Sequence, residues 1–174
     1  MKTYRERHGI KVAALAFAIA SFAAQAEQTE DGRYIMTVYS DMAHGRAILD
    51  GSAGELIEDI GGEALSLEEE IHLCVAYTKA KQVEHATSTC EAALDSAEEE
   101  ARKARRTSFA WSNPAYTAAN GHAMALNNRG VLHALTGNHD EAREMFEAAL
   151  QVGKRHKYAR KNLALLDEEL AATR

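Results

Sequence analysis

Residues 125–132 read ALNNRGVL and residues 159–166 read ARKNLALL, and the two stretches align without a gap at an offset of 34 residues. An offset of this size is typical of helical-repeat proteins, in which each repeat is one supersecondary unit. Between the stretches lies the turn sequence TGNHD at 136–140, and Ala142 and Phe146 follow it at helical spacing. The segment is therefore predicted to fold as helix, tight turn and helix.

The composition favours an all-α protein. The chain has 174 residues, of which 46% are apolar, enough for one compact domain with a buried core. Aromatic residues make up only 6%, alanine is abundant, and there is a single proline. Such a composition suits closely packed helices, because Ala costs least and Pro costs most in a helix interior. We expect a short array of helical hairpins, an α-solenoid, preceded by an extended N-terminal arm.

The first 26 residues have the pattern of a secretory signal peptide. Four basic residues precede an apolar run, and the triplet Ala-Gln-Ala at 24–26 follows it. The run is about a dozen residues long, well short of the roughly 20 that span a bilayer as a helix. We predict cleavage after Ala26, with an uncleaved N-terminal anchor as the alternative. The signal resembles a bacterial export signal, which predicts a periplasmic or secreted protein.

The charge balance limits the classes of partner. Removal of residues 1–26 takes away four Lys/Arg and one Glu, so the net charge changes from −6 to −9. Acidity opposes non-specific binding to nucleic acid or to an anionic membrane, so no nucleic-acid partner is expected. No other stretch after residue 26 looks membrane-spanning, so no membrane span is expected after cleavage. After residue 26, basic residues gather at 102–106 and 154–161. These clusters are interpreted either as charges that complement helix ends or as a docking patch for an acidic partner.

Turn and cap signals divide the chain into segments. The run YIMTVY at 34–39 has strand-like composition and could be an extended arm. Ser52 with Glu55 matches a capping box, and Ser66 is the predicted N-cap of a helix with an acidic first turn. The predicted boundaries are 1–26 for the signal peptide, 27–62 for the arm and a degenerate helical hairpin, 63–101 for hairpin 1, 102–120 for an insertion or linker, 121–155 for hairpin 2, and 156–174 for a C-terminal capping helix.

Small and aromatic residues in hairpin 2 carry a family resemblance. The positions concerned are Gly130, Gly137, Ala142, Phe146 and Ala149. With these residues the segment 123–166 resembles the tetratricopeptide repeat, and residues 66–97 resemble it more weakly. The resemblance implies an array whose first helices line a concave groove, where such proteins often bind a peptide or a protein segment.

Hairpin 1 departs from the family pattern at several positions. It aligns with hairpin 2 at an offset of 56 residues, which is one 34-residue repeat plus an excess of 22. At this offset Cys74 takes the small-residue place, Lys81 the place of the turn glycine, and Cys90 the place of the aromatic. In hairpin 2 itself, His133 stands where the family usually has Tyr, and Lys154 where Pro often ends the repeat.

The two cysteines, Cys74 and Cys90, map to inward-facing positions on the two helices of hairpin 1. In an oxidising compartment such a pair is a disulfide candidate that closes a loop of about 15 residues. Two buried thiols acting as small apolar groups are the alternative. A catalytic redox pair is less favoured, because the chain has no Cys-x-x-Cys.

The resemblance also assigns positions to the groove. Asn128 and Asn162 are the sharpest candidates, because an amide offers both a donor and an acceptor to an extended backbone. The alternative is that these two amides tie neighbouring helices together. The predicted groove comprises His72, Asn127, Asn128, Val131, Tyr158, Lys161 and Asn162.

No catalytic, cofactor or metal motif is found. The eight histidines lack ligand spacing, and no nucleophile elbow, phosphate loop or dinucleotide fingerprint occurs. The predicted function is therefore a non-catalytic, exported scaffold or adaptor that binds a protein or peptide in its groove, without a cofactor. The alternatives are a self-associating, homo-oligomeric envelope subunit, and a small-ligand binder or enzyme in which segment 100–120, with Trp111 and Tyr116, closes over a pocket. The sequence leaves open whether the N-terminal arm itself fills the groove.

Overall fold

The computed structural model describes residues 24–28, 33–60, 65–107 and 114–173 of the chain. The bulk of the predicted signal peptide and Trp111 lie outside these ranges. The elements are β1 (Ala24–Gln28), β2 (Ile35–Tyr39), α1 (Ala43–Leu49), α2 (Ala53–Asp59), α3 (Leu67–Lys79), α4 (Val83–Thr107), α5 (Pro114–Leu135), α6 (His139–Val152) and α7 (Lys157–Ala172).

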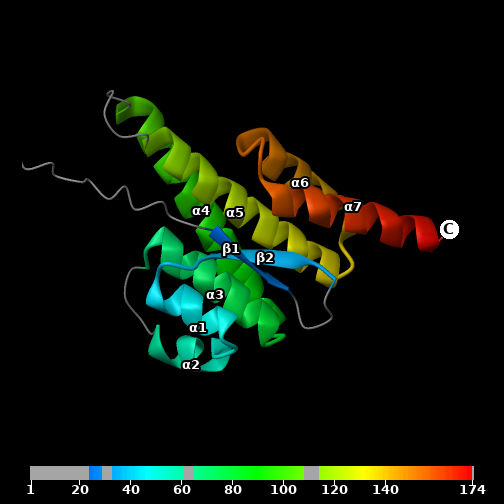
Figure 1. Cartoon of the computed structure of the whole chain (residues 1–174), viewed down its shortest axis with the longest axis horizontal. Coiled ribbons are helices and arrows are strands. Elements are labelled where there is room, and N and C mark those ends of the chain that lie inside the picture. The colour runs from blue at the N-terminus through cyan, green and yellow to red at the C-terminus, as the bar shows by residue number, and fades with distance from the viewer. Residues whose placement is uncertain (1–23, 29–32, 61–64, 108–113, 174) are drawn as a thin grey trace, which may run out of the picture.

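The helices form the predicted repeat array. Helices α3 and α4 make one hairpin, α5 and α6 make the next, and α7 packs on α6 at the C-terminal end (Figure 1). The short helices α1 and α2 pack beside α3 and correspond to the predicted degenerate hairpin. The all-α repeat fold is thus confirmed. Strand β2 lies in the predicted arm, whereas β1 spans the end of the predicted signal peptide and the first two residues of the arm. Among the described residues, no helix is both long and apolar enough to cross a membrane.

Caps explain where two of the helices begin. Ser66 accepts a hydrogen bond from the Glu69 backbone N–H while the Glu69 carboxylate accepts from the Ser66 N–H, which is a complete capping box at the start of α3. The capping box predicted at Ser52 is not formed, since the Ser52 side chain caps nothing at the start of α2. A seven-residue helix is held by packing of residues such as Leu56 more than by its ends.

The segment predicted as an insertion, 102–120, is helical at both ends. Helix α4 continues to Thr107, and α5 begins at Pro114, the one proline, in the first helical position that Pro tolerates best. Ion pairs one helical turn apart support the extension of α4, because Arg102 contacts both Glu98 and Glu99. Lengthened helices therefore absorb most of the 22-residue excess.

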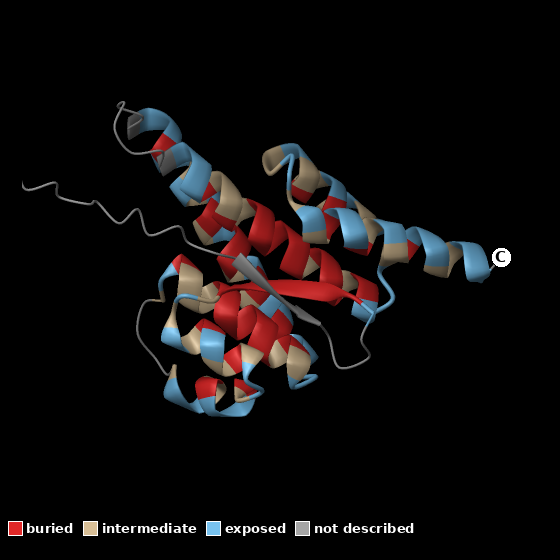
Figure 2. Cartoon of the chain, in the orientation of Figure 1, coloured by how far each residue is buried: buried red, intermediate tan, exposed pale blue. Residues whose placement is uncertain are grey.

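Each hairpin is closed by a different contact between its two helices. In α5–α6, the Phe146 ring packs over Gly130, where an added Cβ would lie 2.7 Å from the ring. In α3–α4, Cys74 and Cys90 are joined in a disulfide with their Cα atoms 4.7 Å apart. Both pairs are buried, and Figure 2 shows the buried positions along the facing sides of the helices.

Strand β2 lies within the fold, not on its surface. Every residue from Tyr34 to Tyr39 is at most 4% exposed, and Figure 2 shows the strand buried along its length. Strand β1 pairs with it antiparallel, from Ala24 opposite Tyr39 to Gln28 opposite Ile35. The predicted arm is therefore part of the core.

Candidate functional site: the concave groove

Strand β2 crosses the first helices of the array, α7, α5 and α3, in that order. Asn162 on α7 contacts Ile35, Asn128 on α5 contacts Thr37, and His72 on α3 contacts Tyr39. The three helix residues are repeat equivalents, separated by the offsets of 34 and 56 residues. Their strand partners are every second residue of β2, because alternate residues of a strand turn their backbone groups to the same edge.

Asn128 clamps the backbone of Thr37. Its Oδ1 accepts from the Thr37 N–H at 2.7 Å, and its Nδ2 donates to the Thr37 carbonyl at 2.8 Å. Oδ1 also accepts from the Thr37 hydroxyl and from Asn127 Nδ2. The amide is fully buried, so these bonds fix which of its atoms is oxygen and which is nitrogen.

Asn162 holds Ile35 in the same two-point way. Its Oδ1 accepts from the Ile35 N–H and its Nδ2 donates to the Ile35 carbonyl, both at 2.8 Å. Asn127 adds a second donor to that carbonyl at 3.0 Å, and its Oδ1 accepts from Asn162 Nδ2 at 2.9 Å. The amides therefore hold the strand and also tie α5 to α7, so both roles considered for them are present.

His72 makes a single contact of the same kind. Its Nε2 accepts from the Tyr39 N–H at 3.2 Å, so Nδ1 carries the ring proton. Nδ1 is buried with no hydrogen-bond partner among the described residues. Burial, together with the nearby His44, lowers the pKa of His72 to about 4, which keeps the ring neutral and able to accept at ordinary pH.

The remaining predicted groove residues do not bind the strand backbone. Val131 is fully buried in the core that also contains Met36 and Val38 of β2. Tyr158 is partly buried, and its ring lies beneath the Lys157 ammonium at 4.7 Å. Lys161 is exposed on α7.

The sequence predicts the clamping side chains and leaves open whether the N-terminal arm is their occupant. The composition of run 34–39 predicts a strand, and in a strand residues 35, 37 and 39 turn their backbone groups to one edge. Nothing in that pattern says which surface the edge meets. The tertiary contacts of Tyr34 supply the answer: its ring stacks on Phe146 and its hydroxyl donates to Glu169.

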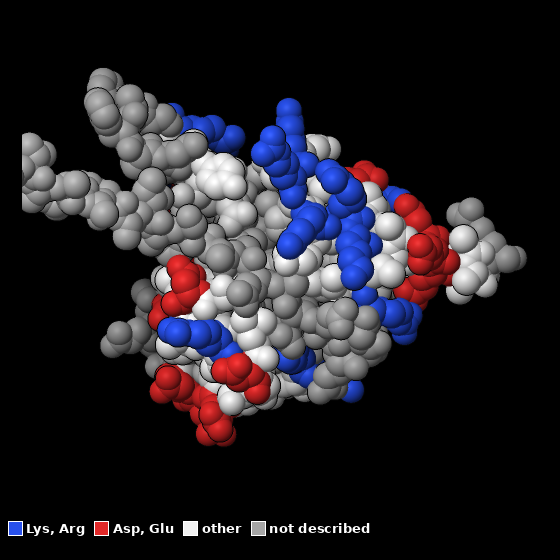
Figure 3. All heavy atoms as spheres, viewed as in Figure 1, with Lys and Arg blue, Asp and Glu red and all other residues white. Residues whose placement is uncertain are grey.

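A basic surface lies next to the groove. Five cations lie between 154 and 161, and none has an acidic partner within ion-pair distance among the described residues. Figure 3 shows Lys and Arg gathered over the α6–α7 turn and the first half of α7. In the other predicted basic cluster, at 102–106, Arg102 and Lys103 form ion pairs with Glu99 of the same helix, α4.

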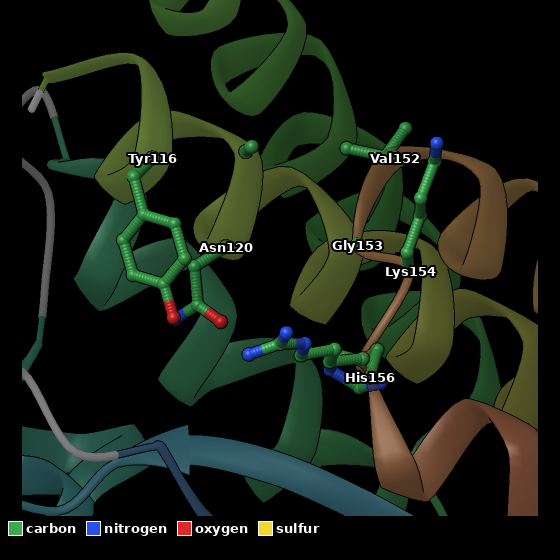
Figure 4. A pocket seen from close by; sticks show the side chains of 8 residues that line it. Tyr116, Asn120, Val152, Gly153, Lys154 and His156 are labelled. Carbon is green, nitrogen blue, oxygen red and sulfur yellow. The ribbon is translucent and has the colours of Figure 1, made fainter.

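A pocket of about 420 Å³ opens between the start of α5 and the α6–α7 turn (Figure 4). His156 Nδ1 accepts from the Ala159 N–H, so Nε2 carries the proton, and it is buried with no partner among the described residues. Burial lowers the pKa of His156 to about 4. The charge of the pocket comes from Lys154 and Arg155, whose cationic groups suit an anion. Its lining is Tyr116, Ala119, Asn120, Val152, Gly153, Lys154, Arg155 and His156.

Metal chemistry has no support within the described ranges, where no group of three His, Cys, Asp or Glu side chains could hold an ion.

Comparison with known proteins identifies one segment. The tetratricopeptide repeat family matches residues 122–156, which span α5 from its middle, α6 and the turn into α7. No curated protein and no solved structure gives a significant match to the chain.

Proposed function

Residues 122–156 of this chain are a tetratricopeptide repeat, and on that premise we propose that the protein is an exported, non-catalytic scaffold for protein–protein interaction. The repeat itself supports the general role of a protein-interaction scaffold. The finer proposal is that its groove is built to hold an extended backbone, and that in this chain the groove holds the protein's own strand.

One observation carries the finer proposal. Repeat-equivalent side chains on three successive first helices bind alternate residues of one extended segment. Such a ladder recognises backbone rather than side chains, and so it suits any extended peptide. The occupant here is covalently tethered and bonded at five backbone atoms of Ile35, Thr37 and Tyr39.

The filled groove changes where a partner binds. A free peptide would have to break buried hydrogen bonds and expose the side chains of β2, each step costing on the order of 1–3 kcal/mol. We therefore place the partner on the composite surface that β2 and the first helices make together. The strand completes that surface and gives it a fixed shape.

Export is supported by the signal pattern and by the disulfide. Disulfides persist in oxidising compartments such as the periplasm, and Cys74 and Cys90 both belong to the chain that remains after cleavage at Ala26. The test is to produce the full chain with a C-terminal tag in a bacterial host and to measure the mass of the product from the periplasmic fraction. A chain beginning at Glu27 and lacking two hydrogens is expected. A full-length product retained in the cytoplasm would contradict export.

The scaffold role is tested by capture from an envelope extract. The tagged mature protein is expected to retain a specific protein that tag alone does not, and the variant Asn128→Ala with Asn162→Ala is expected to lose it because β2 is loosened. The exposed Arg106→Ala is the matched control and should behave as wild type. Circular dichroism confirms equal helix content. Absence of any specifically retained protein would count against the scaffold.

A second candidate function is binding of a small anion in the pocket of Figure 4. Lys154 and Arg155 line it beside His156 and supply the positive charge. Titration calorimetry with inorganic phosphate should show binding that Arg155→Ala weakens and Arg106→Ala leaves unchanged. Equal binding by both variants would place the anion elsewhere.

A further inference from the structure

The two edges of β2 have different partners. Ile35, Thr37 and Tyr39 turn their backbone groups to the helices, so Met36 and Val38 turn theirs to the opposite, outer edge. On that edge the observed partner is β1, with Glu27 opposite Met36 and Gln25 opposite Val38. The outer edge is therefore paired only while β1 is intact.

The predicted signal cleavage site lies inside β1. Cleavage after Ala26 removes residues 24–26, which pair with Tyr39, Val38 and Thr37. Two residues, Glu27 and Gln28, are left opposite Met36 and Ile35. A strand of two residues is below the usual length of about 3–10 and holds weakly, so cleavage leaves the N–H and C=O of Val38 without their partner.

Strand β2 does not depend on β1 to stay extended. Its inner edge is bonded to Asn162, Asn128 and His72, and its side chains are buried. Cleavage thus produces a rigid strand with an open edge, which is a template for an added strand. Strand β1 itself shows that an extended segment fits there in antiparallel register.

Charge is distributed unevenly along this edge. The Ile35 end lies against α7, and the cations of 154–161, which form no ion pair among the described residues, lie in the α6–α7 turn and the first half of α7 (Figure 3). The Tyr39 end lies close to the carboxylates of Asp41, Glu68 and Glu100. An antiparallel strand that is acidic towards its C-terminal end matches this distribution. The sequence of the β1 segment has that character, because it becomes acidic towards its C-terminal end, where residues 27–31 read EQTED.

We propose that, once the signal is removed, the outer edge of β2 binds an extended, acidic segment of a partner protein as an added antiparallel strand. The inference rests on the proposed export and scaffold function and says how that scaffold takes its client. Removal of the signal would then both release the protein and open its binding edge.

The probe is a fluorescent peptide with the sequence of residues 22–31, FAAQAEQTED, whose anisotropy reports binding. It is expected to bind a protein that begins at Glu27, and to bind at least about tenfold more weakly to one that begins at Ala24, where the edge is covered in cis. N-methylation of the peptide at the two positions equivalent to residues 25 and 27 should weaken binding about tenfold or more, because it removes the donors that face β2. Replacing the peptide's three acidic residues by Lys should also weaken it.

Amide hydrogen exchange gives a residue-level readout. In the protein that begins at Glu27, the Val38 amide should exchange fast and become protected when the peptide binds. The Thr37 amide, which faces Asn128, should be protected throughout and serves as the internal control. Equal affinity of the N-methylated peptide, or a Val38 amide already protected in the free monomer, would overturn the proposal. Protection that rises with protein concentration would overturn it in favour of a second copy on the edge.

The same edge can be blocked within the protein. Val38→Pro removes the outward N–H, and Val38→Ala keeps it while removing more of the buried side chain, so it controls for lost packing. A partner captured by Val38→Ala and lost by Val38→Pro supports the edge, provided that Thr37 remains protected in both. Capture by both variants would overturn the edge proposal and leave the scaffold standing, whereas capture by no form of the protein would count against the scaffold itself.

Discussion

The two hairpins of the array, α3–α4 and α5–α6, hold their helices together by different means at equivalent positions. At the 56-residue offset, Cys74 corresponds to Gly130 and Cys90 to Phe146. The second hairpin packs a large ring on a residue without a side chain, and the first replaces that contact by a covalent bond. The same helix-hairpin backbone is therefore held either by a ring packed on glycine or by a disulfide, and only the disulfide depends on the redox environment.

The difference extends to the turns and to the groove. Both turns close with the same pair of backbone bonds, Lys81 N–H to Thr78 and Gln82 N–H to Tyr77 in hairpin 1, matched by Gly137 and Asn138 in hairpin 2. Lys81 takes the left-handed conformation at φ 58° that Gly137 takes at 81°. In the groove, hairpin 1 offers one acceptor on His72 where hairpin 2 offers a two-point clamp on Asn128. Hairpin 1 is weaker in each non-covalent respect, and the disulfide offsets this.

The largest effect is expected from the packing contact of hairpin 2. Phe146 is fully buried and also stacks on Tyr34, with ring centroids 6.3 Å apart. Phe146→Ala should lower the free energy of unfolding by about 3–5 kcal/mol, measured by urea denaturation. The loss should be the same with and without reductant. A loss below about 1 kcal/mol would mean that the ring does not support hairpin 2.

Loss of the disulfide should come next. Cys74→Ala with Cys90→Ala is expected to cost about 3 kcal/mol, because a bridge across a loop of this length restricts the unfolded chain. Wild type treated with dithiothreitol should fall to a similar stability, and Phe146→Ala should show the same additional loss under reduction. A further variant, Cys74→Gly with Cys90→Phe, transfers the Gly–Phe contact of hairpin 2 to hairpin 1. If this contact can replace the disulfide, the variant should be more stable in reductant than the double Ala variant. If this variant is less stable than the double Ala variant, the backbones of the two hairpins differ too much for hairpin 1 to accept the Gly–Phe contact.

The architecture was predictable from the sequence because its determinants are local. The offset between 125–132 and 159–166, the small residues of hairpin 2 and the Ser66 cap all act within one or two helices. The two cysteines were placed by the same repeat register. The segment 102–120 is predicted as an insertion or linker because of the 22-residue excess, and the structure shows that α4 runs through its basic part to Thr107 and that α5 begins at Pro114.

The occupant of the groove was beyond sequence reasoning for a physical reason. The contact between Asn162 and Ile35 spans 127 residues, and its recognition uses backbone atoms that every residue shares. The side chains of residues 34–39 therefore carry no pattern from which the helices that bind this strand could be predicted. The clamping residues were identified because the family resemblance and the repeat register assign them to the groove, whereas the strand belongs to no repeat.

A pH titration probes the single-acceptor contact of hairpin 1. His72 has its pKa lowered to about 4, so between about pH 6.5 and 4 the unfolded chain binds a proton that the folded protein does not. Stability is therefore full above about pH 6.5 and should fall, by at most about 3 kcal/mol from this residue, as the pH drops towards 4. His72→Gln retains an acceptor for the Tyr39 N–H and does not titrate, so it should flatten the profile. His156 also has its pKa lowered to about 4 and should leave a residual slope in both proteins. Identical slopes would mean that His72 is not held neutral by the fold.

The smallest effect tests the turns by exchanging their residues. Lys81→Gly should stabilise the protein by about 1 kcal/mol, because glycine adopts the left-handed conformation without the steric cost that a Cβ brings. Gly137→Lys should destabilise it by a similar amount, and through the backbone alone, since a Cβ at Gly137 meets nothing within 4 Å. If the two substitutions shift the denaturation midpoint in opposite directions, both turns require the same left-handed backbone conformation, and hairpin 1 carries its steric cost at Lys81. If Lys81→Gly were neutral, the lysine side chain must make a compensating contact, and the weakness of hairpin 1 would then lie in its groove contact and not in its turn.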